Sequence, residues 1–142
     1  MAAVDFFNQD IAFKLPKPIK TRRWILEVIR REKKRLAHLN YIFCSDEYLL
    51  ALNQKYLKHK TLTDIITFDT SEIKGIIEAD IFVSIERVRA NAEELQIGAD
   101  DEVHRVLIHG VLHLLGYSDK SKAQKTTMRK KEDAYLSLRL EL

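Results

Sequence analysis

The sequence has few of the residues that cross-link or interrupt a chain: one cysteine, two prolines and four glycines in 142 residues. A single cysteine cannot form an internal disulfide, which excludes a disulfide framework. The scarcity of proline and glycine, together with 46% hydrophobic residues, argues against disordered and fibrous proteins. No stretch approaches the ~20 apolar residues of a membrane span, and no N-terminal apolar run resembles a signal peptide. We therefore expect a cytoplasmic protein.

The spacing of apolar residues predicts a mixture of strands and helices. The predicted strands are 4–7, 11–15, 39–44, 64–70 and 78–84, and the predicted helices are 20–38, 46–56, 85–95, 100–115 and 121–142. No internal repeat, low-complexity tract or linker divides the chain. We predict one α+β domain that spans residues 1–142 and buries the helix 100–115.

The net charge of +3 is small, but the basic residues are unevenly distributed. Residues 14–35 contain ten lysines or arginines against two acids, and residues 120–131 contain six and no acid. If the fold brings these segments together, they form a surface suited to the phosphates of a nucleic acid. The alternative is that they are solvated faces of two charged helices.

Two histidines lie four residues apart in a segment, 106–115, that is otherwise apolar. Residues at this spacing share one face of a helix, and burying an unpaired imidazole costs roughly 2–7 kcal/mol. Gly116 can end the helix in a left-handed cap and bring Asp119 beside both rings. We therefore predict that His109, His113 and Asp119 bind one zinc ion and leave a fourth position open for water, as catalytic sites do.

Alternatives remain open for this cluster and for the chemistry that it performs. The histidine pair alone also fits a surface accident or a satisfied core pair, and an aspartate ligand leaves nickel or manganese open. Zinc peptidases carry a general-base glutamate directly after the first histidine, where this chain has Gly110. A metal that polarises a phosphoryl oxygen, flanked by basic helices, instead favours hydrolysis of phosphodiesters. A zinc peptidase and a non-catalytic module stapled by its metal are the competing hypotheses.

The motifs of the chain resemble those of the YbeY family of endoribonucleases. The strongest match is His109-Gly110-Val111-Leu112-His113-Leu114-Leu115-Gly116-Tyr117, followed by a ligand-capable residue at 119. Three further segments match. Leu52-Asn53-Gln54-Lys55-Tyr56 resembles the family's Leu-Asn-x-x-Tyr-Arg segment, and Thr63-Asp64-Ile65-Ile66-Thr67-Phe68 resembles its Thr-Asp-Val-Leu-Ser-Phe segment. Ala79-Asp80-Ile81-Phe82-Val83-Ser84 resembles its Gly-Asp-Ile-x-Ile-Ser segment. The resemblance covers roughly residues 46 to 135 in the family's order.

This resemblance implies a small mixed sheet flanked by helices, with one zinc ion held by three side chains in a cleft. It also implies a zinc-dependent endoribonuclease that cuts single-stranded rRNA precursors during 16S rRNA maturation and ribosome quality control. The implied partners are RNA and the ribosome or its proteins, and neither a membrane nor DNA. The alternatives are a zinc-dependent peptidase-like hydrolase and a non-catalytic, ribosome-associated metal-binding module.

The chain departs from the family pattern at two positions. The third metal ligand, usually histidine, is Asp119, which keeps a ligand but changes its charge. The arginine expected after the tyrosine of the Leu-Asn-x-x-Tyr segment is replaced by Leu57. Lys58 and His59 are the candidates to take over its cationic, catalytic role, although a lysine cannot reproduce a bidentate guanidinium contact.

Four further residues could serve function or structure. We expect His104 to be a partly buried or surface histidine off the ligand face, and Cys44 to be a core residue. Tyr117 could stack on a base or pack under the metal loop. Asp80 could fix a turn or orient a metal-binding histidine.

Overall fold

The computed structural model describes residues 3–142, which form four strands and five helices. The strands are β1 (Val4–Asn8), β2 (Arg35–Cys44), β3 (Ile65–Asp69) and β4 (Ile76–Ser84), and the helices are α1 (Pro18–Arg31), α2 (Asp46–Leu57), α3 (Ile85–Leu95), α4 (Ala99–Leu114) and α5 (Lys122–Arg139). The sheet order is β1-β2-β4-β3, with only β3 antiparallel to its neighbour. The predicted α+β class and mixed sheet are confirmed.

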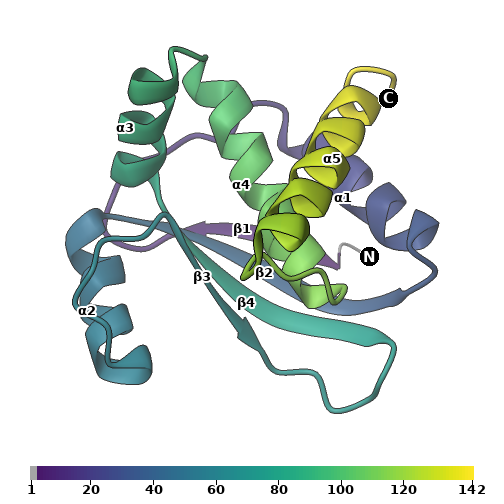
Figure 1. Ribbon diagram of the computed structural model, residues 1–142, viewed down its shortest axis with the longest axis horizontal. Coiled ribbons are helices and arrows are strands. Elements are labelled where there is room, and N and C mark those ends of the chain that lie inside the picture. Colours follow the sequence, from purple (N-terminus) through teal and green to yellow (C-terminus); the bar gives the residue numbers. More distant parts are fainter. Residues whose placement is uncertain (1–2) are drawn as a thin grey trace.

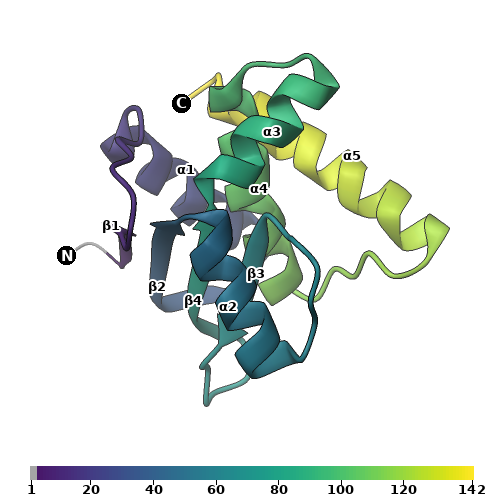
Figure 2. The ribbon, with the colours of Figure 1, turned by 90° about the vertical axis from the view of Figure 1, so that its left-hand side faces the viewer.

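The sheet is covered unequally on its two faces. Side chains of a strand alternate between faces, and in β4 the residues Ile81 and Val83 point into the main core. Helices α1, α3, α4 and α5 lie on this side, whereas α2 lies beside one end of the opposite face (Figures 1 and 2). There Leu49 of α2 packs with Cys44 and Ile66 in a smaller cluster. None of the helices described is long and apolar enough to cross a membrane.

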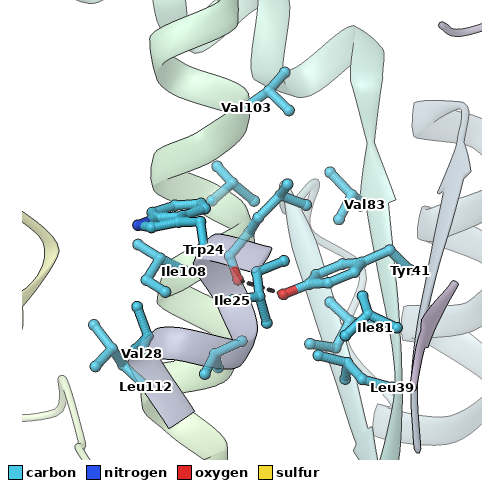
Figure 3. Close-up of a cluster of buried hydrophobic side chains, with 14 of the residues drawn as sticks. Trp24, Ile25, Val28, Leu39, Tyr41, Ile81, Val83, Val103, Ile108 and Leu112 are labelled. Atoms are coloured by element: carbon cyan, nitrogen blue, oxygen red, sulfur yellow. Dashed lines mark hydrogen bonds between the residues drawn. The ribbon is translucent and has the colours of Figure 1, made fainter. Parts of the chain in front are cut away.

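Helix α4 runs through the middle of the main core, as its apolar sequence predicts. Its residues Ile108 and Leu112 are fully buried between the sheet and α1 (Figure 3). The hydroxyl of Tyr41 on β2 donates to the carbonyl of Leu107 over 2.9 Å, which ties the helix to the sheet. The indole of Trp24 on α1 donates to the carbonyl of Tyr135 on α5, which ties these two helices together. These contacts place α4 between the sheet and α1.

Two predicted elements are wrong. The helix predicted over 20–38 ends at Arg31, because Lys33 adopts a left-handed conformation, φ 62°, that no helix continues through. Residues from Arg35 onward join β2 instead. No strand forms over 11–15, where the ring of Phe13 lies edge-on to Phe43 at 4.8 Å and the carbonyl of Phe13 accepts a hydrogen bond from the side chain of Asn8 and not from a neighbouring strand. The final helix also ends earlier than predicted, at Arg139.

Candidate metal centre

The chain turns back sharply at the end of α4, as the glycine there predicts. Gly116 has φ 104°, its N–H donates to the carbonyl of His113, and the N–H of Tyr117 donates to the carbonyl of Leu112. These two hydrogen bonds form a Schellman cap, which a glycine at this position favours. The cap reverses the chain so that Asp119 returns beside the last turn of the helix.

The three predicted ligands converge at this cap. The Nε2 atoms of His109 and His113 lie 2.9 Å apart, and Oδ2 of Asp119 lies 3.5 Å from each of them. Zinc bonds of ~2.0–2.2 Å in a tetrahedron place two ligand atoms roughly 3.4 Å apart. The three side chains therefore form a group that can hold one metal ion.

The hydrogen bonds of the two rings test whether a metal fits. Nδ1 of His109 lies 2.6 Å from a carboxylate oxygen of Glu132, and Nδ1 of His113 lies 3.1 Å from the carbonyl of Tyr117. Both oxygens accept, so each Nδ1 donates its proton, and in neutral rings both Nε2 atoms carry a lone pair that a metal ion or a proton can bind. Two lone pairs that face each other at 2.9 Å repel unless a cation lies between them. The donor set therefore fits a divalent metal.

Glu132 on α5 contacts one of the candidate ligands, and the sequence reasoning missed it. Glu132 is only 2% exposed. Its second carboxylate oxygen lies 3.4 Å from the guanidinium of Arg105, and the same guanidinium pairs with Glu102 at 2.5 Å. A carboxylate on the outer nitrogen of a ligating histidine fixes its tautomer and raises its basicity. One signal was available, because position 132 falls in the apolar stripe of α5 between Met128 and Tyr135.

The charges around His109 change its proton affinity. Burial lowers the pKa of this imidazole, but the hydrogen bond and charge of Glu132, with the charges of Asp119 and Asp64, outweigh burial and raise the pKa above its usual range. The same negative potential that attracts a proton attracts a metal cation. A proton and a metal therefore compete for this ring.

A cleft of about 420 Å³ opens next to His113, between α2 and the edge strand β3. Its walls include three threonines, Thr61, Thr63 and Thr67, as well as His59 and Leu57. Of the two cationic candidates, His59 thus lines the cleft, whereas Lys58 is exposed at the left-handed residue that ends α2.

The loop that follows α2 is held by one buried side chain. Asn53 donates its amide to the carbonyl of Thr61 over 2.9 Å and accepts the backbone N–H of His59 through its own carbonyl. Asn53 is 4% exposed. It therefore sets the path of the loop that carries both cationic candidates.

The two basic segments meet near the metal centre. Lys33 and Lys34 are exposed and directly follow Glu32, whose carboxylate accepts a hydrogen bond from the hydroxyl of Tyr117. The second segment begins immediately after Asp119, and α1 and α5 lie side by side in the fold. Part of the charge is neutralised, because Glu27 pairs with two arginines of α1.

Gly110 lies on the face of α4 that packs against the sheet. A Cβ at this position would come within 2.9 Å of Cδ1 of Ile65 and 3.0 Å of Cδ1 of Ile81. The glycine therefore lets the helix approach the sheet closely. A glutamate here would point into the sheet and not toward the ligands, so the position cannot supply the general base of a zinc peptidase.

The other residues singled out in the sequence have structural surroundings. His104 is more buried than predicted, at 3% exposed, and Cys44 is a core residue as predicted. Asp80 accepts a hydrogen bond from Asn40 on the sheet face away from α4, so the carboxylate that orients His109 is that of Glu132 and not that of Asp80. The ring of Tyr117 packs against the main core, and its hydroxyl donates a hydrogen bond to Glu32.

Known proteins resemble the chain over nearly its whole length. Residues 5–139 match the model of the family described as endoribonuclease YbeY. The chain is 53% identical over 134 residues to endoribonuclease YbeY of Cytophaga hutchinsonii, covering 94% of each protein, and 50% identical over 135 residues to that of Amoebophilus asiaticus, covering 95% of this chain and 92% of the relative. The solution structure of TM1509 from Thermotoga maritima superposes with a TM-score of 0.69 at 26% identity, over 96% of this chain and 88% of that one. This chain belongs to the endoribonuclease YbeY family.

Proposed function

We propose that this protein is a metal-dependent endoribonuclease that cuts single-stranded rRNA precursors in the cytoplasm, during 16S rRNA maturation and ribosome quality control. The observation that carries the proposal is the pair of Nε2 atoms of His109 and His113, which face each other at 2.9 Å beside an open cleft. Membership of the endoribonuclease family supports RNA as the substrate.

His109, His113 and Asp119 are the proposed ligands of one zinc ion, and nickel or manganese are alternatives that reconstitution distinguishes. A divalent metal supplies Lewis acidity, which acidifies a coordinated water and polarises a phosphoryl oxygen. Over residues 3–142 no fourth histidine, cysteine or carboxylate joins the group. Such an open set is typical of catalytic sites, whereas a purely structural zinc has four protein ligands. The open set therefore disfavours the non-catalytic module.

The surroundings of the ligands suit a single strand of RNA. The threonine hydroxyls of the cleft can hydrogen-bond sugars and phosphates, and the exposed lysines at 33 and 34 and at 120 and 122 supply positive charge nearby. We propose that His59, with Lys58 beside it, provides the cationic contact that the family makes with arginine. Binding through these charges weakens as salt concentration rises.

The test is reconstitution of the metal-stripped protein with zinc, nickel or manganese at one equivalent, followed by a cleavage assay. The substrates are a fluorescent single-stranded RNA, a precursor of 16S rRNA, the matching single-stranded DNA, and a panel of peptides. We expect metal-dependent cleavage of both RNAs and none of the DNA or peptides. Cleavage by the metal-stripped protein would refute the proposed site. So would an Asp119→Ala variant that is as active as wild type at equal metal content.

A further inference from the structure

Tyr117 connects the metal centre to the rest of the fold through two separate groups. Its backbone carbonyl accepts the Nδ1–H of His113 over 3.1 Å. Its phenol hydroxyl donates to Oε1 of Glu32 over 2.8 Å. The residue lies in the short turn between His113 and Asp119. Any displacement of its backbone therefore changes the orientation of His113 and the position of Asp119.

Glu32 lies directly after α1, 85 residues before Tyr117 in the chain. Its side chain is 13% exposed, and its second oxygen accepts hydrogen bonds from the hydroxyl of Tyr135 and from Nζ of Lys131, the latter over 3.3 Å. Burial alone would raise the pKa of this carboxyl, but the bonds from Tyr135, Tyr117 and Lys131 outweigh burial and lower it. Glu32 is therefore a charged, fully engaged acceptor.

Lys131 closes the cluster from α5. Its ammonium lies 5.5 Å from the ring centre of Tyr117 and 5.8 Å from that of Tyr135, which is within the range of cation–π attraction. The ring of Tyr117 is thus fixed at its hydroxyl by Glu32 and on its face by Lys131. Glu32, directly after α1, and Lys131 on α5 therefore help to set its orientation.

We propose that Glu32 is a positioning residue for the metal centre, which acts through Tyr117 to hold His113 and Asp119 in place. The inference rests on the metal site of the proposed function. In this arrangement the end of α1 helps to set metal affinity although it contributes no ligand. Groups that support a ligand from behind commonly account for about 10–100-fold in metal affinity.

The chain offers a matched pair of variants to test the inference. Tyr117→Phe and Tyr135→Phe each remove one hydroxyl that donates to Glu32. Of the two residues, only Tyr117 also contacts the ring of His113, through its backbone carbonyl. Both variants, with Glu32→Gln, are stripped of metal. Zinc affinity is then measured by competition with a chromophoric chelator, and coordination geometry by the visible absorption of the cobalt-substituted protein. Thermal unfolding of the metal-free proteins reports any general loss of stability.

We expect zinc affinity to fall about tenfold or more in Tyr117→Phe and Glu32→Gln, with a changed cobalt spectrum, and to stay within about threefold of wild type in Tyr135→Phe. Equal zinc affinity in Tyr117→Phe and wild type would overturn the inference and leave the metal site intact. Equal losses in both tyrosine variants would also overturn it, since they would reflect general destabilisation. Wild-type protein that binds neither zinc nor cobalt would overturn the metal site itself, and the inference with it.

Discussion

Helix α4 carries three histidines, and the two ends of the helix use them differently. His104, near the start, lies against Trp24 and has partners for both ring nitrogens, the hydroxyl of Thr21 at 3.3 Å and the carbonyl of Asp100 at 2.7 Å. His109 and His113, near the end, each have one protein partner at Nδ1 and turn Nε2 toward each other, and His113 also lines the cleft.

The difference between the two ends lies in the second ring nitrogen and not in burial alone. A buried imidazole whose two nitrogens are both paired needs nothing further, so His104 is complete without a ligand. The Nε2 atoms of His109 and His113 face each other and the carboxylate of Asp119, and in neutral rings neither atom has a proton to donate. Counting partners at each nitrogen therefore separates a structural histidine from a candidate ligand within one helix.

The strongest test of this comparison exchanges a histidine at each end for alanine. We expect His109→Ala to lose zinc stoichiometry and to reduce RNA cleavage to background, because two ligands do not hold the ion. His104→Ala should retain one zinc per chain and lose about 1–3 kcal/mol of stability, since it leaves buried partners unpaired. Metal analysis, cleavage assays and urea unfolding measure the three quantities. Loss of zinc in a folded His104→Ala protein would remove the distinction.

Glu132 sharpens the comparison, because it is the partner that makes His109 a better ligand. Glu132→Gln removes the charge opposite Nδ1 of His109 and leaves Arg105 with one carboxylate fewer. We expect zinc affinity to fall by about 10–100-fold while the fold persists. Asp133→Asn is the matched control, since it neutralises the exposed neighbour on the same helix and should leave affinity unchanged. Competition with a chelator measures both, and equal affinities would contradict the role of Glu132.

The features that the sequence predicted correctly depend on local signals. The i, i+4 histidines, the apolar segment around them and the glycine that ends α4 all lie within one stretch of about ten residues, where helix periodicity and cap geometry decide the structure. The strands β2 and β4 were likewise evident from their buried, β-branched and aromatic residues.

The features that escaped prediction depend on contacts between distant segments. Glu32 and Glu132 stand in charged runs, and only the packing of α1 and α5 beside the metal centre makes Glu32 a partly buried acceptor and Glu132 a buried one. The end of α1 was misplaced for a similar reason. Leu36 continues the helical period, but pairing of β2 with β4 outweighs this local preference. The apolar stripe of α5 gives a local signal for Glu132, but no pattern within a single element shows that Glu32 meets Tyr117.

The smallest expected effect is on the pH dependence of folding stability, which has opposite signs for the histidines at the two ends of α4. Burial, assisted by the charge of Arg139, lowers the pKa of His104, whereas Glu132 and its neighbours raise that of His109 against burial. Unfolded histidines have a pKa of about 6.5. Stability from His104 is therefore present above about pH 6.5 and lost as pH falls, because the unfolded state binds the proton first. Stability from His109 is present below about pH 6.5 and lost as pH rises through its folded pKa.

In metal-free wild type these opposite slopes offset each other, so single variants are needed to expose them. In metal-free His104→Gln, unfolding free energy should fall as pH rises from about 6 to 8. In metal-free His109→Gln it should fall as pH drops from about 7 to 5.5. Urea unfolding at fixed ionic strength measures both slopes. Added zinc should reverse the slope of His104→Gln, because a proton on His109 excludes the metal and affinity rises with pH. Slopes of the same sign in the two metal-free variants would mean that the histidines at the two ends of α4 do not differ in charge state.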